Sequence, residues 1–204
     1  VFHGLGGSAA EFLIDNEVGA LGAALGFIVV APQAAQLGGA VAFDPVSPAA
    51  NNVDVTFFDD VLTCAAATWS ISPQRVWVTG MSNGGLMTGQ LIATRSNVIA
   101  SAAPLSGGIS GDLDPYADAI PVLVTYGGDD DYASDTDFAV LYDEMTEALD
   151  ANGNFQVLCN QGQGHEVRAE FWPWIFQFLV DHPQHVDPEP YADGLPEVFP
   201  DYCH

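Results

Sequence analysis

Short apolar runs alternate with longer amphipathic stretches along this chain, and the alternation restricts the folds that it can adopt. The runs span only a few residues each and are rich in β-branched residues, which favours strands buried on both faces. They cover residues 26–32, 75–80, 98–107, 120–128 and 154–160. Strands of this kind with helices between them are typical of a doubly wound, mostly parallel sheet, so the sequence predicts an α/β fold.

The stretches between and around these runs have the spacing of helices. They cover residues 9–25, 56–69, 83–95, 137–152 and 170–181. Gly153 follows the fourth stretch and is a frequent residue just beyond a helix end. We expect one α/β domain over residues 1–182, and an irregular Pro- and Asp-rich tail over residues 183–204 that packs on it or extends from it.

The charge of the chain is strongly negative and narrows its range of partners. There are 27 Asp and Glu residues against three Lys and Arg residues, for a formal net charge of −24. Nucleic acids and anionic membranes would repel such a polyanion, so we expect no nucleic-acid partner. No apolar run is long enough to span a membrane. Acidity of this kind suits a saline or extracellular setting, so we expect a secreted protein; the sequence leaves the oligomeric state open.

Cysteine is scarce, and its spacing predicts no metal site. The three cysteines are Cys64, Cys159 and Cys203, with no Cys-x-x-Cys pair and no Cys/His cluster. The sequence therefore implies neither a metal nor another cofactor. Cys203 lies in the polar tail, which a disulfide would tie down, and its partner is either Cys159 or Cys64.

Ser82 lies in the segment Gly80-Met81-Ser82-Asn83-Gly84, which fits the pattern G-x-S-x-G. A strand is expected before it and a helix after it, so the serine would sit on a tight strand-to-helix turn with its hydroxyl exposed. Glycines at both ends of the motif leave room where the turn is tightest. The alternative is an ordinary turn in which Ser82 caps the helix.

A serine nucleophile needs a histidine base held by a carboxylate. Of the five histidines, His165 is best placed, because it lies in a loop after the last expected strand, whereas His182, His185 and His204 lie at or beyond the last helix. Asp129, Asp130 and Asp131 directly follow the strand at 120–128, and spacing alone does not choose between them. A solvated acidic loop is the alternative; a calcium loop would need a pattern that is absent.

Two backbone N–H groups are candidates for binding an oxyanion. One belongs to Asn83, which follows the serine at the start of a helix. The other belongs to Leu5 in the segment HGLGG, whose His3 and Gly4 follow the end of an apparent strand. Glycines there would let the backbone approach a substrate closely.

The order of these segments resembles α/β-hydrolases, and more narrowly the feruloyl esterases and polyhydroxybutyrate depolymerase-like esterases. The segments that carry the likeness are HGLGG (3–7), VVAPQ (29–33), NNVDVTFFDDVL (51–62), SPQRVWVTGMSNGG (72–85), YGGDD (126–130) and GHE (164–166). The resemblance places the triad acid at Asp130, although Tyr126 stands where the group often has histidine. The chain also departs from the group, because it has no long insertion that could form a lid and the strands that usually precede the His-Gly pair are absent. We therefore expect a lidless sheet that lacks these N-terminal strands.

The resemblance implies a serine ester hydrolase with Ser82, Asp130 and His165 as the triad. Its substrates would be aryl esters of the feruloyl type or polyesters. Met81, Phe43 and Trp172 could offer them apolar contact area, and packing in the core is the alternative for these three residues. Two other classes stay open. One is a serine peptidase or acylaminoacyl hydrolase on the same fold, and the other is a binding protein that kept the fold without its chemistry.

Overall fold

A four-stranded parallel sheet forms the centre of the protein. The computed structural model describes residues 1–110 and 117–204. The strands are β3 (Trp77–Met81), β4 (Ser101–Leu105), β5 (Val122–Tyr126) and β8 (Gln156–Asn160), and they lie in that order across the sheet. All three pairings are parallel, so the carboxyl ends of the four strands meet at one edge. A crevice at that edge is where such sheets bind ligands.

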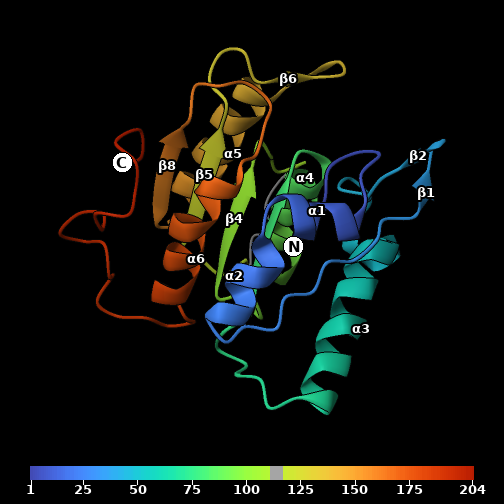
Figure 1. Cartoon of the computed structure of the whole chain (residues 1–204), viewed down its shortest axis with the longest axis horizontal. Coiled ribbons are helices and arrows are strands. Elements are labelled where there is room, and N and C mark those ends of the chain that lie inside the picture. The colour runs from blue at the N-terminus through green and yellow to red at the C-terminus, as the bar shows by residue number, and fades with distance from the viewer. Residues whose placement is uncertain (111–116) are drawn as a thin grey trace.

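Helices cover both faces of the sheet (Figure 1). One face carries α1 (Ala9–Asp15), α2 (Val18–Ala24) and α6 (Trp172–Asp181), and the other carries α4 (Asn83–Arg95) and α5 (Phe138–Asn152). Alternate residues of the strands feed two separate core clusters: Leu123 packs in the cluster of α6, whereas Val122 and Val124 pack in the cluster of α4 and α5. This is the period-two pattern of a strand buried on both faces.

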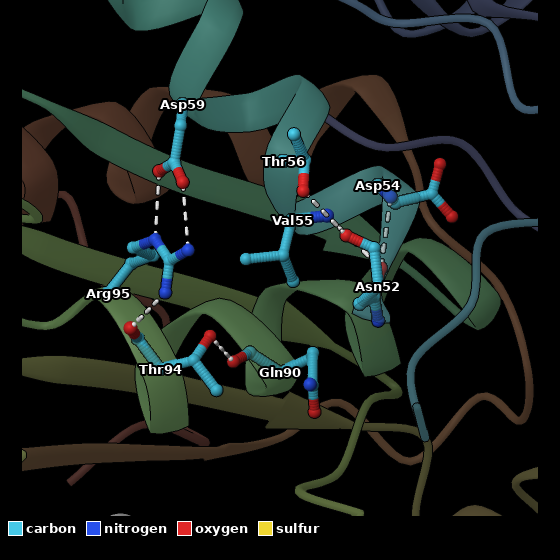
Figure 2. A network of polar contacts seen from close by, with 8 residues as sticks. All are labelled: Asn52, Asp54, Val55, Thr56, Asp59, Gln90, Thr94 and Arg95. Carbon is cyan, nitrogen blue, oxygen red and sulfur yellow. Dashed lines mark hydrogen bonds and ion pairs between the residues drawn. The ribbon is translucent and has the colours of Figure 1, made fainter. Parts of the chain in front are cut away.

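Helix α3 (Val53–Thr68) stands beside the sheet, and polar contacts fix its first half to α4. The Asn52 side chain accepts hydrogen bonds from the N–H groups of Asp54 and Val55 and so caps the helix. Arg95 of α4 donates from Nε and Nη2 to the two carboxylate oxygens of Asp59, at 2.8 Å each (Figure 2). A two-pronged contact of this kind sets both the position and the rotation of α3.

The remaining elements are short. They are the hairpin β1 (Gln36–Leu37) with β2 (Ala40–Val41), the hairpin β6 (Tyr132–Ala133) with β7 (Thr136–Asp137), and two 3₁₀ turns, η1 (Ala49–Asn51) and η2 (Ala169–Phe171). In the described part of the chain, no helix is both long and apolar enough to cross a membrane.

Four of the five predicted strands are confirmed, and the one predicted over residues 26–32 is wrong. Residues 26–32 run as irregular chain, although their composition is that of a strand. A strand needs a hydrogen-bonding neighbour, and within the described residues the free side of β3 carries no strand but an isolated parallel bridge between Phe2 and Gly80. The helix predicted over residues 9–25 is two helices, because Glu17 adopts a left-handed conformation with φ of 57°.

The C-terminal tail packs against β8. The Cys159–Cys203 disulfide is confirmed, and Cys64 is exposed and unpaired. Leu158 and His204 exchange two backbone hydrogen bonds, and Tyr191 and Phe199 are buried in the α6 cluster. His182, at the end of α6, is fully buried between the Phe178 carbonyl oxygen and the Glu189 carboxylate. The tail is therefore part of the domain's packing even without helices or strands of its own.

Candidate active site

Ser82 forms a strained turn between β3 and α4. Its φ of 59° and ψ of −122° are unusual for a residue with a side chain, and strain of this kind is found at functional sites. A side chain at Gly84 would collide with the Phe2 carbonyl oxygen, and a Cβ at Gly80 would lie 2.5 Å from the Gly84 oxygen. The glycines that flank the serine are therefore required by close backbone approach, and the geometry is that expected of a nucleophile turn.

His165 and Asp131 form a hydrogen-bonded pair at the same edge of the sheet. His165 Nδ1 lies 2.6 Å from Asp131 Oδ1, and the carboxylate is fully buried. Its other oxygen accepts hydrogen bonds from Ser106 Oγ at 2.7 Å and from Gly127 N at 2.6 Å. A carboxylate can only accept here, so Nδ1 carries the hydrogen, and Nε2 of the neutral ring carries a lone pair.

The prediction that Asp130 holds the histidine is wrong, because the partner is Asp131. Gly128 turns the chain at a φ of 80°, and Asp131 N–H closes that turn by donating to the Gly128 oxygen at 3.0 Å. Asp129 and Asp130 then lie on the outside of the turn and are exposed. The acid loop therefore places its buried carboxylate one residue later than the motif resemblance implied.

The loop of His165 and the loop of Asp131 are held together through their backbones. Gly164 N–H donates to the Gly127 oxygen at 2.9 Å, and a side chain at Gly127 would collide with the Gly164 carbonyl group. Phe138, the first residue of α5, stacks on the His165 ring with 4.4 Å between ring centroids. The imidazole is thus fixed from two sides, by a carboxylate on its edge and by an aromatic ring on its face.

His3 supports the glycine-rich loop at residues 3–7. Its Nε2 accepts a hydrogen bond from Ala34 N–H at 3.2 Å, so its Nδ1 carries the hydrogen and donates to the Gly4 oxygen at 2.8 Å. A Cβ on Gly4 would lie 3.5 Å from the Ser82 Cβ, which puts this loop against the serine. Within the described residues, the N–H of Leu5 has no acceptor.

Asn83 contributes its side chain as well as its backbone. As the first residue of α4, its N–H has no acceptor within the helix. Its side chain accepts from Phe43 N–H at 2.8 Å and donates to the Phe43 oxygen at 3.1 Å. This two-way contact fixes the segment that follows β2 beside the start of α4.

The three residues expected to offer apolar contact area are all in the core. Met81, Phe43 and Trp172 are 7%, 2% and 1% exposed, and Trp172 packs against Phe12 and Phe176. Side chains this deeply buried offer little surface to a ligand, so this expectation is not supported. Within the glycine-rich loop itself, the apolar side chain of Leu5 is 53% exposed.

Tyr126 stands at the end of β5, directly before the acid loop. It stacks on Tyr142 at 3.9 Å between ring centroids, and its hydroxyl accepts a hydrogen bond from Asn160 Nδ2 at 3.1 Å. Burial and the nearby carboxylates of Asp143 and Asp129 raise the pKa of Tyr126. Burial also raises the pKa of Tyr142, to about 12. Both phenols therefore stay neutral across the range in which an imidazole titrates.

Sequence reasoning missed two side chains of the site, Ser106 and Phe138. Ser106 follows β4 at a φ of 41°, and the pair of glycines after it was the available signal for a special turn at a strand end. Phe138 had no signal, because an apolar residue at the start of a helix usually packs in the core. Among the described residues, no group of three or more His, Cys, Asp or Glu side chains could hold a metal ion.

Comparisons with known proteins concern the fold of the chain and short stretches of its sequence. No family model matches the chain. It is 52% identical over 42 residues to a poly(3-hydroxyalkanoate) depolymerase C from Paucimonas lemoignei, which is 21% of this chain and 10% of that protein. It is 37% identical over 71 residues to feruloyl esterase D from Neurospora crassa, which is 33% of this chain and 24% of that protein. The matched stretches thus span at most a quarter of these curated relatives.

Solved structures match over much more of the chain. The native crystal structure named pOPH superposes with a TM-score of 0.73 at 20% identity, over 100% of this chain and 83% of the other. SOBER1 from Arabidopsis thaliana superposes with a TM-score of 0.65 at 18% identity, over 88% of this chain and 95% of the other. At such identities the likeness concerns the fold.

The chain has the fold of these solved structures, a central parallel sheet flanked by helices, so the predicted α/β fold is confirmed. The two proteins that its sequence matches in part are by their names a poly(3-hydroxyalkanoate) depolymerase and a feruloyl esterase.

Proposed function

We propose that the protein hydrolyses carboxylic esters, with Ser82 as nucleophile, His165 as general base and Asp131 as the group that orients the histidine. The observation that carries the proposal is the 2.6 Å contact between His165 and the buried Asp131 at the sheet edge where the Ser82 turn ends β3. Two hydrogen bonds link these strand ends, since Ser82 N–H donates to the Leu105 carbonyl oxygen and the Ser106 hydroxyl donates to the Asp131 carboxylate.

In the first half of the reaction, Ser82 Oγ attacks the ester carbonyl carbon while its proton passes to His165 Nε2. The new oxyanion accepts hydrogen bonds from the N–H groups of Leu5 and Asn83, each worth about 3–4 kcal/mol in the transition state. The tetrahedral intermediate then expels the alkoxide, which takes the proton from His165. An acyl-enzyme on Ser82 remains.

In the second half, water attacks the acyl carbon and gives its proton to His165 Nε2. The intermediate collapses, the proton returns to Ser82 Oγ and the carboxylic acid leaves. Asp131 stays ionised throughout, because its task is to hold the Nδ1 hydrogen and to stabilise the imidazolium. Each proton thus moves between Ser82, the alcohol or water, and a single ring nitrogen.

For the substrate, we propose feruloyl-type aryl esters or polyesters such as polyhydroxyalkanoates. This rests on the names of the two curated relatives and on the exposed position of Leu5 beside the proposed oxyanion site. Release of product from methyl ferulate, polyhydroxybutyrate and an aromatic polyester would separate the classes. Turnover of soluble esters without release from either polymer would remove the polyester alternative.

Replacement of Ser82 by Ala tests the chemistry. Hydrolysis of p-nitrophenyl butyrate should fall by at least a thousandfold, and labelling by a fluorophosphonate should vanish at this position. A wild-type chain that binds esters but forms no adduct at Ser82 would show a binding protein instead. Unchanged turnover in Ser82→Ala would sink the proposed mechanism.

A further inference from the structure

A buried phenylalanine lies on the face of the proposed general base. Phe138 is 3% exposed, and its ring centroid lies 4.4 Å from that of His165, with 28° between the two ring planes. The two rings therefore meet nearly face to face. In the described part of the chain, Phe138 belongs to neither of the two core clusters, so its contact with His165 stands apart from the packing of helices on the sheet.

The position of Phe138 is fixed by the same residue that orients His165. Phe138 N–H donates to the Asp131 carbonyl oxygen at 2.9 Å, while the Asp131 carboxylate lies 2.6 Å from His165 Nδ1. Between Asp131 and Phe138 the chain turns back through the hairpin of β6 and β7, and Asp137 then caps α5 by accepting two backbone hydrogen bonds. Asp131 thus holds the imidazole by its side chain and the phenylalanine by its main chain.

The contact between the two rings differs in strength for the two forms of the imidazole. The face of an aromatic ring carries partial negative charge, and it attracts a cation within about 6 Å of its centroid. A neutral imidazole gains only stacking there, whereas an imidazolium gains this attraction as well. The His165 side chain is 15% exposed, so solvent weakens the attraction little.

This difference bears on the proposed reaction, because His165 is neutral at rest and charged in each tetrahedral intermediate. Only an interaction that is stronger in the transition state than in the ground state raises kcat. An aliphatic side chain of similar size would hold the imidazole equally well in both forms. An aromatic face adds a preference for the charged form.

We propose that Phe138 is a positioning residue whose ring favours the imidazolium form of His165. Two groups then share the stabilisation of that cation, the Asp131 carboxylate at its edge and the Phe138 ring on its face. The effect of Phe138 on turnover rests on the proposed function, whereas its effect on the charge of His165 is a property of the folded chain alone.

The test weakens the face of the ring while nearly keeping its shape. Phe138 is replaced in the full chain by 4-fluoro-, 3,4,5-trifluoro- and pentafluorophenylalanine, because each fluorine withdraws electron density from the face that attracts the cation. The first readout is the ratio of imidazolium to neutral His165, measured by NMR at one fixed pH at which both forms are present. We expect this ratio to fall stepwise, by about fivefold in the pentafluoro variant, and kcat on p-nitrophenyl butyrate to fall in parallel.

Phe176 provides the matched control. It is also buried, and its ring stacks on Phe27 rather than on a histidine. The same fluorinated residues at Phe176 should leave both the ratio and kcat within about twofold of the wild-type values. Phe138→Leu is a second variant, made with an ordinary amino acid, and it should lower the ratio as well because it removes the aromatic face.

Two results would overturn the proposal. One is a ratio that stays constant across the fluorinated series, which would leave Phe138 as a packing residue only. The other is a ratio that falls while kcat keeps its wild-type value, which would separate the charge of His165 from the rate of turnover. A wild-type chain that hydrolyses no ester would contradict the proposed function instead, and the ratio would still decide whether Phe138 favours the imidazolium.

Discussion

The acid–base half and the oxyanion half of the proposed active site differ in how firmly the surrounding structure holds their residues in place. On the acid–base side, Asp131 is fully buried, makes three hydrogen bonds and lies among loops that close directly on the four-stranded sheet. On the oxyanion side, Leu5 is 53% exposed. Its loop is held through His3, which accepts a hydrogen bond from Ala34 in an irregular segment. The sheet fixes the geometry of the acid–base half. The geometry of the oxyanion half depends instead on the edge beyond β3, where the sheet is least complete.

The largest expected effect falls on the better supported half. Asp131→Asn should lower kcat by about ten-thousandfold, because an amide there favours the wrong tautomer of His165. Asp130→Asn is the matched control, since it removes the same charge one residue away on an exposed side chain, and its kcat should change by less than about twofold. The ratio of the two effects, measured on p-nitrophenyl butyrate, identifies the acid. Equal effects would contradict the pairing.

A smaller effect is expected on the oxyanion side. His3→Ala leaves the Ala34 N–H without its acceptor and removes one donor from the Gly4 oxygen, which still accepts from Gly7 N–H at 3.1 Å. We expect a fall in kcat of roughly tenfold to a hundredfold, less than the loss of a direct oxyanion donor, because the loop is loosened rather than removed. The exposed His185→Ala serves as control. A kcat that stays at the wild-type level would mean that the loop is fixed by other contacts.

Ser106 tests how much of the precision around Asp131 comes from one hydroxyl. Ser106→Ala removes one of the three hydrogen bonds to the carboxylate and leaves that from Gly127 in place. A hydrogen bond of about 1 kcal/mol corresponds to a fall in kcat of about fivefold. KM should stay within about twofold. A rise in KM at constant kcat would instead place Ser106 in substrate binding.

The smallest effect on activity is expected from the attachment of α3. Arg95→Met should destabilise the fold by about 1 kcal/mol, since Asp59 is 43% exposed and solvent weakens the pair. Ester turnover should be unchanged, because the contact lies at the end of α4 away from Ser82. Urea unfolding gives the stability, with Arg75→Met as the control. A loss of turnover with unaltered stability would link α3 to the active site.

The sequence predicts those parts of the fold that depend on local pattern. The helix at 83–95 and the strand-turn-helix at Ser82 follow from residues within a few positions of each other, and the structure has them at these places. The strand predicted over residues 26–32 is wrong because these residues have the composition of a strand but, among the described residues, no strand pairs with them. A local sequence pattern indicates which secondary structure a segment favours, whereas a strand forms only where another strand pairs with it.

The site residues divide in the same way. The loops that carry Leu5, Ser82 and His165 were located by their motifs. The choice between Asp130 and Asp131 depends on the length of the turn at Gly128. A turn longer or shorter by one residue would bring a different carboxylate to His165. The sequence could not decide whether Met81, Phe43 and Trp172 line a substrate site or pack in the core. An aromatic or thioether side chain gives the same sequence pattern in both places.

The disulfide between Cys159 and Cys203 relates the packing of this domain to the redox conditions of the compartment in which the protein lies. Cys159 lies near the end of β8, just ahead of the loop that carries His165, and the covalent link binds that strand to the tail. Disulfides persist in oxidising compartments and are rare where glutathione keeps thiols reduced. The strand that leads into the His165 loop and the tail that packs against it are thereby joined by a bond suited to an oxidising compartment.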